Sequence, residues 1–293
     1  MLEKLRQMLK PLAAVPQAGD GRVTLRDVLD RGWFELWYQP KIELRSTRLV
    51  GAEGLVRARR PDGSLISPAA FLPGAPEGDM LALTERVIIT ALRDFDDCLE
   101  HGAAIKLSVN APVCALVKLP LARMLREQRP RSAHWRGLIL EVTEDEILND
   151  LKVVNAVADE LRGLNCTLAL DDFGAGYSSL ARLRQLPFSE LKIDRSYVAN
   201  CHADKVNAGL CETIVELAKR FGLKTVAEGI ETTRESHRLQ GIGCDIGQGY
   251  LFAKPMPKAQ FIGSISRRLV GTPLPAAKAS ARAGWLRRQY ASS

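Results

Sequence analysis

The chain has 293 residues, of which 46% are hydrophobic and 26% are charged, and this is the composition of an ordinary globular protein. The formal net charge is +7, but residues 267–293 carry +6 and no acid, so about +1 remains for residues 1–266. The body therefore shows no charge pattern typical of duplex nucleic-acid binding. No apolar run approaches the roughly 18 residues of a membrane span, and the N-terminus lacks the apolar core of a signal peptide.

The cysteines and histidines indicate where the protein functions and which metal it lacks. The six cysteines are scattered and form no Cys-x-x-Cys pair, which is typical of reduced thiols in a cytoplasmic protein. The four histidines show no metal-ligand spacing, so a zinc site is not expected.

Composition divides the chain into three segments. Residues 1–20 have an amphipathic helical pattern that ends in a linker containing proline, glycine and aspartate. Residues 21–266 form the main body. Residues 267–293 are basic and rich in alanine, and we expect a flexible tail there. Weak contact of this tail with a membrane or another anionic surface is the alternative.

Hydrophobic periodicity and turn residues predict the elements of the first half of the body. A short helix over 25–30 ends at Gly32, and two strands follow over 34–44 and 49–59. Pro40 lies inside the first strand and indicates an edge or a β-bulge. Residues 61–78 are rich in turn formers. They precede a helix over 81–101, a strand over 104–110, a helix over 115–129 and a strand over 138–144.

The second half continues the alternation of helix and strand. After a helix over 151–164, an apolar strand over 167–170 stops at Asp171 and Asp172, where a glycine-containing turn would let both carboxylates converge. The expected elements then are helix 180–186, strand 190–194, helix 206–221, strand 223–228, helix 232–239, strand 243–252 and a helix to about 269. About eight strands, nearly all followed by helices, predict an α/β fold of the closed (β/α)₈ barrel type.

Polar residues stand at the C-terminal ends of these strands, where such barrels carry catalytic groups. Any one of them alone would more often be a solvated residue at a strand end. Seven strand ends on one rim favour a functional site instead. The residues are Glu53, Asn110, Glu141 with Glu144, Asp171 with Asp172, Lys192 with Asp194, Glu228 with Glu231, and Gln248.

A ring of carboxylates with one asparagine amide suits Mg²⁺ or Mn²⁺ and not Zn²⁺. So many carboxylates at one mouth would repel one another without cations. The adjacent pair Asp171 and Asp172 can supply one bridging and one single ligand, which is the arrangement of two-metal phosphoester hydrolysis.

Two basic residues each have a functional and a structural interpretation. Lys192 could orient or polarise an attacking water, or it could be buried in an ion pair with Asp194 on the same strand face. Arg57 shares a strand face with Glu53 and is placed to bind a phosphate oxygen, or it forms a salt bridge with a neighbouring acid.

Together these residues lie in motifs that resemble those of the EAL family of cyclic di-GMP phosphodiesterases, which are bacterial signalling enzymes. The motifs are YQP from Tyr38, EGLVR from Glu53, SVN ending at Asn110, EVTE from Glu141, DDFGAGYSSL from Asp171, LKID from Leu191, AEGIE from Ala227 and QGYLFAKPMP from Gln248. They run from about residue 34 to 263, some four-fifths of the chain.

The resemblance implies a modified (β/α)₈ barrel whose first strand is antiparallel, and hydrolysis of one phosphodiester of cyclic di-GMP to linear pGpG. It further implies two Mg²⁺ or Mn²⁺ ions. The first would be bound by Glu53, Asn110, Glu141 and Asp171, and the second by Asp171 and Asp172.

The same resemblance assigns the remaining residues. Glu228 would be a second-metal ligand or the general base, Lys192 would hold the nucleophilic water, and Gln248 would support that water or the substrate. Contacts with substrate would come from Gln39, Arg57, Asp194 and Gln248. Glu144 and Glu231 would anchor the DDFGAGYSS loop, which would couple metal binding to homodimerisation.

Three departures from the family pattern bear on activity. Gly54 replaces the usual alanine beside Glu53, Ala58 stands where a tryptophan is common, and residues 73–80 replace an acidic segment. The alternative to an enzyme is a receptor or interaction module that binds cyclic di-GMP without turnover. Every acid, the asparagine and the lysine are present, which favours the enzyme. The first 33 residues are too few for a sensor domain, so we expect a free-standing phosphodiesterase or an excised catalytic module.

Overall fold

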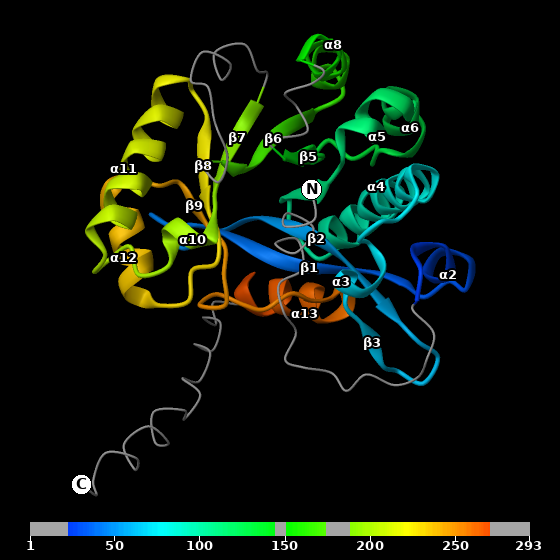
Figure 1. Cartoon of the computed structure of the whole chain (residues 1–293), viewed down its shortest axis with the longest axis horizontal. Helices are drawn as coiled ribbons and strands as arrows, with labels where there is room; N and C mark the ends of the chain where they lie inside the picture. Colours follow the sequence, from blue (N-terminus) through cyan, green and yellow to red (C-terminus); the bar gives the residue numbers. More distant parts are fainter. Residues whose placement is uncertain (1–22, 144–150, 174–187, 270–293) are drawn as a thin grey trace, which may run out of the picture.

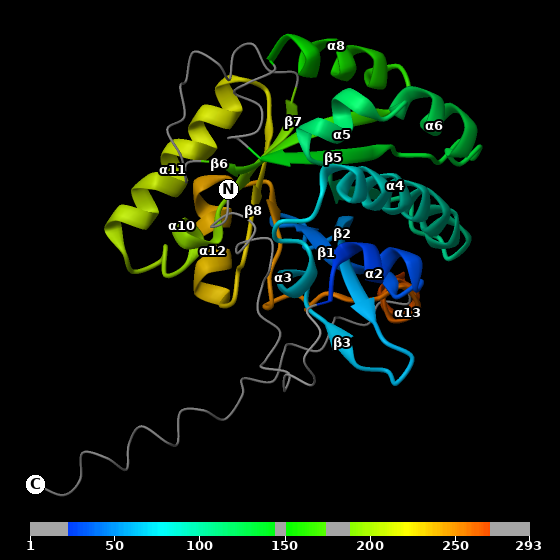
Figure 2. The same ribbon diagram turned by 45° about the vertical axis from the view of Figure 1, so that its right-hand side comes forward.

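The strands of the protein close into a barrel, seen in a computed structural model that describes residues 23–143, 151–173 and 188–269 (Figure 1). The sheet has the order β10-β1-β9-β8-β7-β6-β5-β4-β2-β3, and β1 pairs with β2 as well, which joins the two ends of the sheet. Helices lie around the outside of this barrel, as the turned view also shows (Figure 2). The predicted α/β barrel is therefore confirmed.

The first strand runs against its neighbours. β1 (Phe34–Glu43) is antiparallel to β2 (Leu49–Arg59), to β9 (Ile246–Gly247) and to β10 (Met256–Pro257). A short β3 (Leu65–Ile66) extends the sheet beyond β2. The bulge expected near Pro40 is present between Lys41 and Ile42. On its other edge, β1 pairs with β10 up to Tyr38 and with β9 from Ile42, so Pro40 lies where neither strand needs its missing N–H.

The other strands of the barrel are parallel, so their C-terminal ends meet at one mouth. They are β4 (Lys106–Asn110), β5 (Leu138–Thr143), β6 (Cys166–Phe173), β7 (Phe188–Ile193) and β8 (Lys224–Ala227), and β4 is parallel to β2. Most of the predicted site residues lie within, at the end of, or just after the C-terminal halves of these strands, and the topology therefore brings them to the same mouth.

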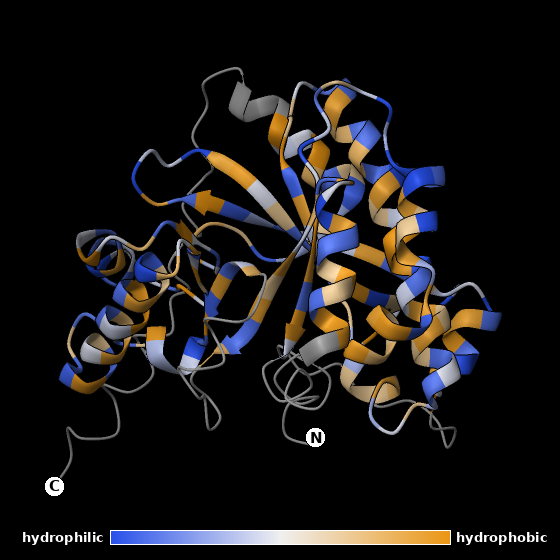
Figure 3. Ribbon diagram, turned by 90° about the horizontal axis from the view of Figure 1, so that it is seen from above, coloured by the Kyte–Doolittle hydropathy of each residue, from blue (hydrophilic) through white to orange (hydrophobic). Residues whose placement is uncertain are grey.

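Amphipathic helices cover the barrel and carry both hydrophobic and hydrophilic segments (Figure 3). Capping boxes begin two of them, built from Thr24 with Asp27 and from Thr232 with Glu235, and Gly243 ends α12 with a φ of 83°. The helices are α2 (Leu25–Asp30), α3 (Pro68–Phe71), α4 (Glu77–Glu100), α5 (Val113–Lys118), α6 (Leu121–Gln128), α8 (Leu151–Arg162), α10 (Arg195–Val198), α11 (Lys205–Arg220), α12 (Thr233–Ile242) and α13 (Lys258–Leu269).

Two helix predictions were wrong at their boundaries. The single helix expected over 115–129 is two helices, α5 and α6, because Pro120 between them has no N–H to continue the first. The segment over 61–78 was expected to consist of turns, yet it contains β3 and α3, and α4 begins at Glu77. Glu77 and Asp79 in the first turn of α4 interact favourably with the helix dipole.

The strand expected over 243–252 is also wrong, because β9 covers only Ile246–Gly247. After Gly247 the chain turns, and the N–H of Leu251 donates to the carbonyl of Ile230. Gly249 lies so close to the Ile230 backbone that a Cβ there would be 2.1 Å from the Ile230 carbonyl oxygen. This backbone contact, and not hydrophobicity, sets the end of the strand.

The described part of the chain contains one large apolar core, and five of its six free cysteines are buried. Within those same residues, no helix combines the length and the apolar character that a membrane crossing requires. The predicted segments over 1–20 and 180–186, the tail beyond residue 269, and Glu144 lie outside the described residues.

Candidate active site

Lys192 is the centre of the barrel mouth. It lies on β7, its side chain is 1% exposed, and its Nζ faces carboxylates from four other places in the chain. The distances are 2.5 Å to Glu141 Oε2, 2.8 Å to Glu228 Oε1, 3.1 Å to Asp171 Oδ2 and 3.9 Å to Glu53 Oε1. Four residues that the sequence placed on one rim therefore converge on one ammonium group.

The structural alternative for Lys192, an ion pair with Asp194, is wrong. Asp194 is buried and acts as the N-cap of α10, where its Oδ1 accepts hydrogen bonds from the backbone N–H of Ser196 at 2.8 Å and from the Ser196 hydroxyl at 2.5 Å. The end of β7 thus separates two roles: Lys192 faces the barrel interior, and Asp194 starts the next helix.

Amide side chains hold Glu53 from the other side. Asn110 Nδ2 donates to Glu53 Oε1 at 3.1 Å, and Gln248 Nε2 donates to Glu53 Oε2 and to Gln39 Oε1, the latter at 3.0 Å. Gln39 in turn donates to the carbonyl of Ala253 at 3.1 Å. Gln248 is fully buried, and its Oε1 has no hydrogen-bond partner among the described residues, so this acceptor is free for a ligand or a water.

The paired aspartates reach the site through a β-bulge. β6 continues beyond Leu170 to Phe173. Leu170 pairs with Leu191 and Phe173 pairs with Ile193, so β6 has one more residue than β7 between these two pairs. Asp172 adopts a φ of 55°, a left-handed conformation that aspartate tolerates better than most residues. A β-bulge, and not the predicted glycine-containing turn, is present here. It interrupts the alternation of side chains at Asp171 and Asp172.

The electrostatics of the mouth call for additional positive charge. Burial raises the pKa of Asp171 well above its ordinary value; Lys192 opposes this shift, and neighbouring acids, Glu228 foremost, add to it. Burial would also raise the pKa of Glu141, but Lys192 and Lys41 lower it below the ordinary range. The interior holds two lysines, Lys41 and Lys192, against six buried carboxylates, namely those of Glu53, Glu141, Asp171, Asp172, Glu190 and Glu228. Buried carboxylates thus outnumber buried lysines here, and bound cations would offset that excess.

The donor set therefore fits Mg²⁺ or Mn²⁺, because it consists of carboxylates and one amide oxygen. In the arrangement seen, the Lys192 ammonium stands among these donors. Across the described ranges, no three His, Cys, Asp or Glu side chains form a ready-made metal site. An ion held by these side chains would stand where the Lys192 ammonium lies in this structure.

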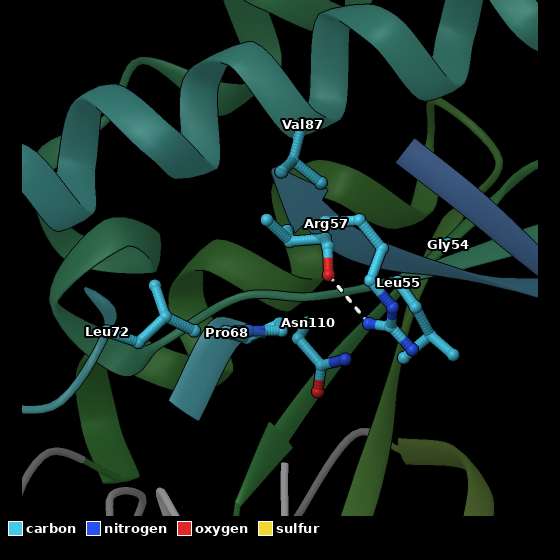
Figure 4. A pocket seen from close by; sticks show the side chains of 8 residues that line it. Gly54, Leu55, Arg57, Pro68, Leu72, Val87 and Asn110 are labelled. Atoms are coloured by element: carbon cyan, nitrogen blue, oxygen red, sulfur yellow. Dashed lines mark hydrogen bonds between the residues drawn. The ribbon is translucent and has the colours of Figure 1, made fainter. Parts of the chain in front are cut away.

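Arg57 lies beside the cluster, in a small open pocket that Asn110 shares (Figure 4). The rest of the lining is largely apolar and includes Leu72 and Val87. The Arg57 guanidinium donates through Nη1 to the carbonyl of Val56 at 2.7 Å, and its Nε is buried without a partner among the described residues. Burial lowers the pKa of Arg57 although nearby Glu53 raises it. The alternative of a salt bridge is not seen within the described ranges, which leaves this cation able to bind an anion.

Glu228 and Glu231 are two further predicted residues, and they differ in burial. Glu228 is buried beside Lys192, whereas Glu231 is exposed at the start of the turn before α12, where its backbone N–H donates to Glu235. Glu144 and most of the DDFGAGYSS loop lie outside the described residues, so the loop-anchor roles of Glu144 and Glu231 stay predictions.

Sequence reasoning missed Lys41 and Glu190. Lys41 is 3% exposed and its Nζ lies 2.8 Å from Glu141 Oε1 and 3.6 Å from Glu190 Oε2. Two-residue alternation could have found both, because Lys41 follows Gln39 by two residues on β1 and Glu190 precedes Lys192 by two on β7.

Comparisons with known proteins identify the family of this chain. Residues 22–255 match the model of the EAL domain. The bifunctional diguanylate cyclase/cyclic di-GMP phosphodiesterase MucR of Pseudomonas aeruginosa is 36% identical over 245 residues, which are 83% of this chain and 36% of MucR. The chain spans between 30% and 60% of the length of four curated relatives from that organism.

Solved structures share the fold. A structure of the PaMucR phosphodiesterase in complex with c-di-GMP superimposes with a TM-score of 0.73 at 35% identity, over 81% of this chain and 97% of that one. A manganese and cyclic di-GMP complex of Klebsiella pneumoniae BlrP1 has a TM-score of 0.64 at 25% identity, over 77% and 57% of the two chains. The matching domain model, the related sequences and the shared barrel show that this chain belongs to the EAL domain family.

Proposed function

We propose that this protein hydrolyses one phosphodiester bond of cyclic di-GMP, giving linear pGpG, with two Mg²⁺ or Mn²⁺ ions. The observation that carries the proposal is the convergence of Glu53, Glu141, Asp171 and Glu228 on Lys192 inside a metal-suited, negatively charged mouth. Relatives at 35–36% identity are named cyclic di-GMP phosphodiesterases, and a manganese complex of a more distant member supports the choice of metal.

The ligands follow from the donor set and the family resemblance. Glu53, Asn110, Glu141 and Asp171 would hold one ion, and Asp171 and Asp172 would hold the second, with Glu228 as a further ligand or as the general base. Such ions, when bound, lower the pKa of water and stabilise the attacking and leaving oxygens of an in-line displacement.

The chain's own side chains would orient the reactants. Lys192, once it moves aside, would donate to the attacking water and so orient its lone pair toward phosphorus. Gln248 has a buried Oε1 without a partner among the described residues, and this oxygen would accept a hydrogen bond from the same water or from substrate. Arg57 has a buried Nε without a partner among the described residues, and it would bind a phosphate oxygen of the substrate. Gln39 would position Gln248 and reach the substrate beside it.

Turnover of cyclic di-GMP tests this function directly. Metal-loaded wild type should release pGpG, and metal-stripped protein and Glu53→Ala should not. A suitable control is Asp97→Asn, since Asp97 is paired with Lys258 on the outside of the barrel and should leave turnover intact. Tight binding of cyclic di-GMP by metal-loaded wild type without pGpG release would overturn the enzyme and favour the receptor alternative.

We also propose homodimerisation, which follows from the family resemblance. Light scattering on the purified chain, with and without Mn²⁺, tests it, and a monomeric mass in both conditions would reject it. The basic tail lies outside the described residues, and its weak contact with an anionic surface stays a prediction. Deleting residues 271–293 and measuring binding to anionic vesicles tests that contact.

A further inference from the structure

We propose that Lys41 is a positioning residue of the barrel mouth, which holds Glu141 in a fixed orientation and is itself neutralised by Glu190. This inference rests on the proposed metal-dependent function. It concerns two residues to which neither the family motifs nor the predicted roles assign a part.

The contacts divide Glu141 between two lysines. Lys41 Nζ is 2.8 Å from Glu141 Oε1, and Lys192 Nζ is 2.5 Å from Glu141 Oε2. Glu141 is 1% exposed, so water does not compete for either oxygen. Because Lys41 fixes Oε1, the carboxylate cannot rotate freely, and Oε2 stays turned toward Lys192 and the other carboxylates. Oε2 is therefore the oxygen that an ion in the mouth would meet.

The strand register explains why Lys41 lies deeper in the barrel than Glu141 and contacts it from the side away from the mouth. β1 runs against the parallel strands, so Lys41 lies one interior position deeper than Gln39, just as Glu190 lies one interior position deeper than Lys192 on β7. Lys41 pairs with Gly51 on β2, and an added Cβ on Gly51 would be 3.7 Å from Lys41 Cβ and Cδ and 2.8 Å from the Lys106 carbonyl oxygen. The Lys106 carbonyl therefore favours glycine at this position, and the lysine stem passes at an ordinary van der Waals distance.

Glu190 supplies the balancing charge. Its Oε2 is 3.6 Å from Lys41 Nζ and has no hydrogen bond among the described residues, so the ammonium is its charge partner. Without this acid, Lys41 would leave one more net positive charge beneath the mouth and oppose cation binding. With Glu190 present, the pair fixes Glu141 and adds almost no net charge.

The test compares Lys41→Met with Glu190→Gln, because the two changes alter the local charge in opposite directions. Mn²⁺ affinity is measured by calorimetry without substrate, and turnover of cyclic di-GMP is measured separately. Glu190→Gln should weaken Mn²⁺ binding by roughly tenfold, since Lys41 is then unbalanced. Lys41→Met should bind Mn²⁺ more tightly than wild type, yet lower kcat by about tenfold with KM unchanged, because Glu141 is no longer held.

Two further variants keep the proposal falsifiable. The double variant Lys41→Met/Glu190→Gln removes both charges and should restore wild-type Mn²⁺ affinity while kcat stays low, and it serves if Lys41→Met alone fails to fold. Lys258→Met is the matched control, because that lysine also contacts two carboxylates but lies on the outside of the barrel. It should leave Mn²⁺ affinity and kcat unchanged.

The outcomes separate this proposal from the proposed function. Opposite shifts of Mn²⁺ affinity in the two single variants support Lys41 as a positioning residue, even if wild type releases no pGpG and the phosphodiesterase function fails. Folded single variants that both match wild type in Mn²⁺ affinity and kcat would overturn it and leave the function standing. Shifts of both variants in the same direction would overturn it as well, because a purely structural pair predicts equal damage from either loss.

Discussion

Two clusters in this protein each place one lysine among carboxylates, and they serve different ends. In the mouth, Lys192 is 1% exposed and lies within 4 Å of four acids. On the outside of the barrel, Lys258 at the start of α13 contacts Asp94 at 3.0 Å and Asp97 at 2.8 Å on α4, and its side chain is 43% exposed. We call Tyr38, Asp94, Asp97 and Lys258 the outer seam.

The outer seam joins a strand to two helices. The Tyr38 hydroxyl donates to Asp94 Oδ2 at 2.6 Å, so β1, α4 and α13 meet at one carboxylate. Tyr38 and Gln39 are neighbours on β1, yet one points to the seam and the other to the mouth, because side chains alternate along a strand. In the seam, Lys258 and Asp97 are about half exposed, whereas the charged groups of the mouth are buried and carboxylates outnumber lysines there. A buried excess of carboxylates favours a site for cations, and a half-exposed ion-pair cluster favours a packing role.

The largest expected effect separates the two lysines. Lys192→Met should lower cyclic di-GMP turnover by about 10³-fold, because the residue that orients the reacting water is lost. It should also destabilise the metal-free protein by about 3 kcal/mol, since buried carboxylates lose their cation. Lys258→Met should leave turnover intact and change the free energy of unfolding by less than about 1 kcal/mol, because that pair is half-exposed. Urea unfolding and pGpG release measure both, and equal losses in the two variants would contradict the comparison.

A smaller effect is expected at the buried part of the outer seam. Tyr38→Phe removes the hydroxyl that Asp94 accepts from, and Asp94 keeps Lys258 as a partner. We expect the free energy of unfolding to fall by about 1 kcal/mol. Turnover at saturating substrate should not change, and a loss of more than tenfold would show that the seam also positions Gln39.

The pH dependence of stability gives Tyr38 a second readout. Burial, and then the charge and hydrogen bond of Asp94, raise the pKa of Tyr38 well above its ordinary value. A raised folded-state pKa means that the stabilisation is complete below the unfolded-state pKa of about 10 and is lost as the pH rises beyond it. The free energy of unfolding should therefore fall less steeply above about pH 10 in Tyr38→Phe than in wild type, as measured by urea titrations. Parallel slopes would contradict this assignment.

The smallest effect is expected at the family departure beside Glu53. A Cβ at Gly54 would lie 3.1 Å from Val109 Cγ1 and 3.2 Å from Leu36 Cδ2, so these side chains must shift by a few tenths of an ångström. Crowding in Gly54→Ala costs about 1 kcal/mol, and the lower entropy of the unfolded chain returns a similar amount. Stability and turnover should therefore stay near those of wild type, and a tenfold change in turnover would show that Gly54 tunes the mouth.

The sequence by itself determined the barrel and the rim on which most of the candidate site residues lie, whereas the antiparallel first strand was implied by the family resemblance. Strand alternation and the meeting of parallel strand ends are local and topological rules, so Glu53, Asn110, Glu141, Asp171, Lys192, Glu228 and Gln248 could be placed on one rim before any coordinates. Pro120 could also have predicted the break between α5 and α6 from the sequence alone.

Only the tertiary structure decided which charges meet. The bulge at Asp172 depends on the register between β6 and β7, and the end of β9 depends on the backbone contact of Gly249 with Ile230. Lys41 and Glu190 come from strands almost 150 residues apart, and their partnership with Glu141 exists only because the closed barrel brings three side chains across its interior. Strand alternation could place Lys41 and Glu190 in the barrel interior, but it does not specify that they meet Glu141, because that contact joins residues distant in sequence.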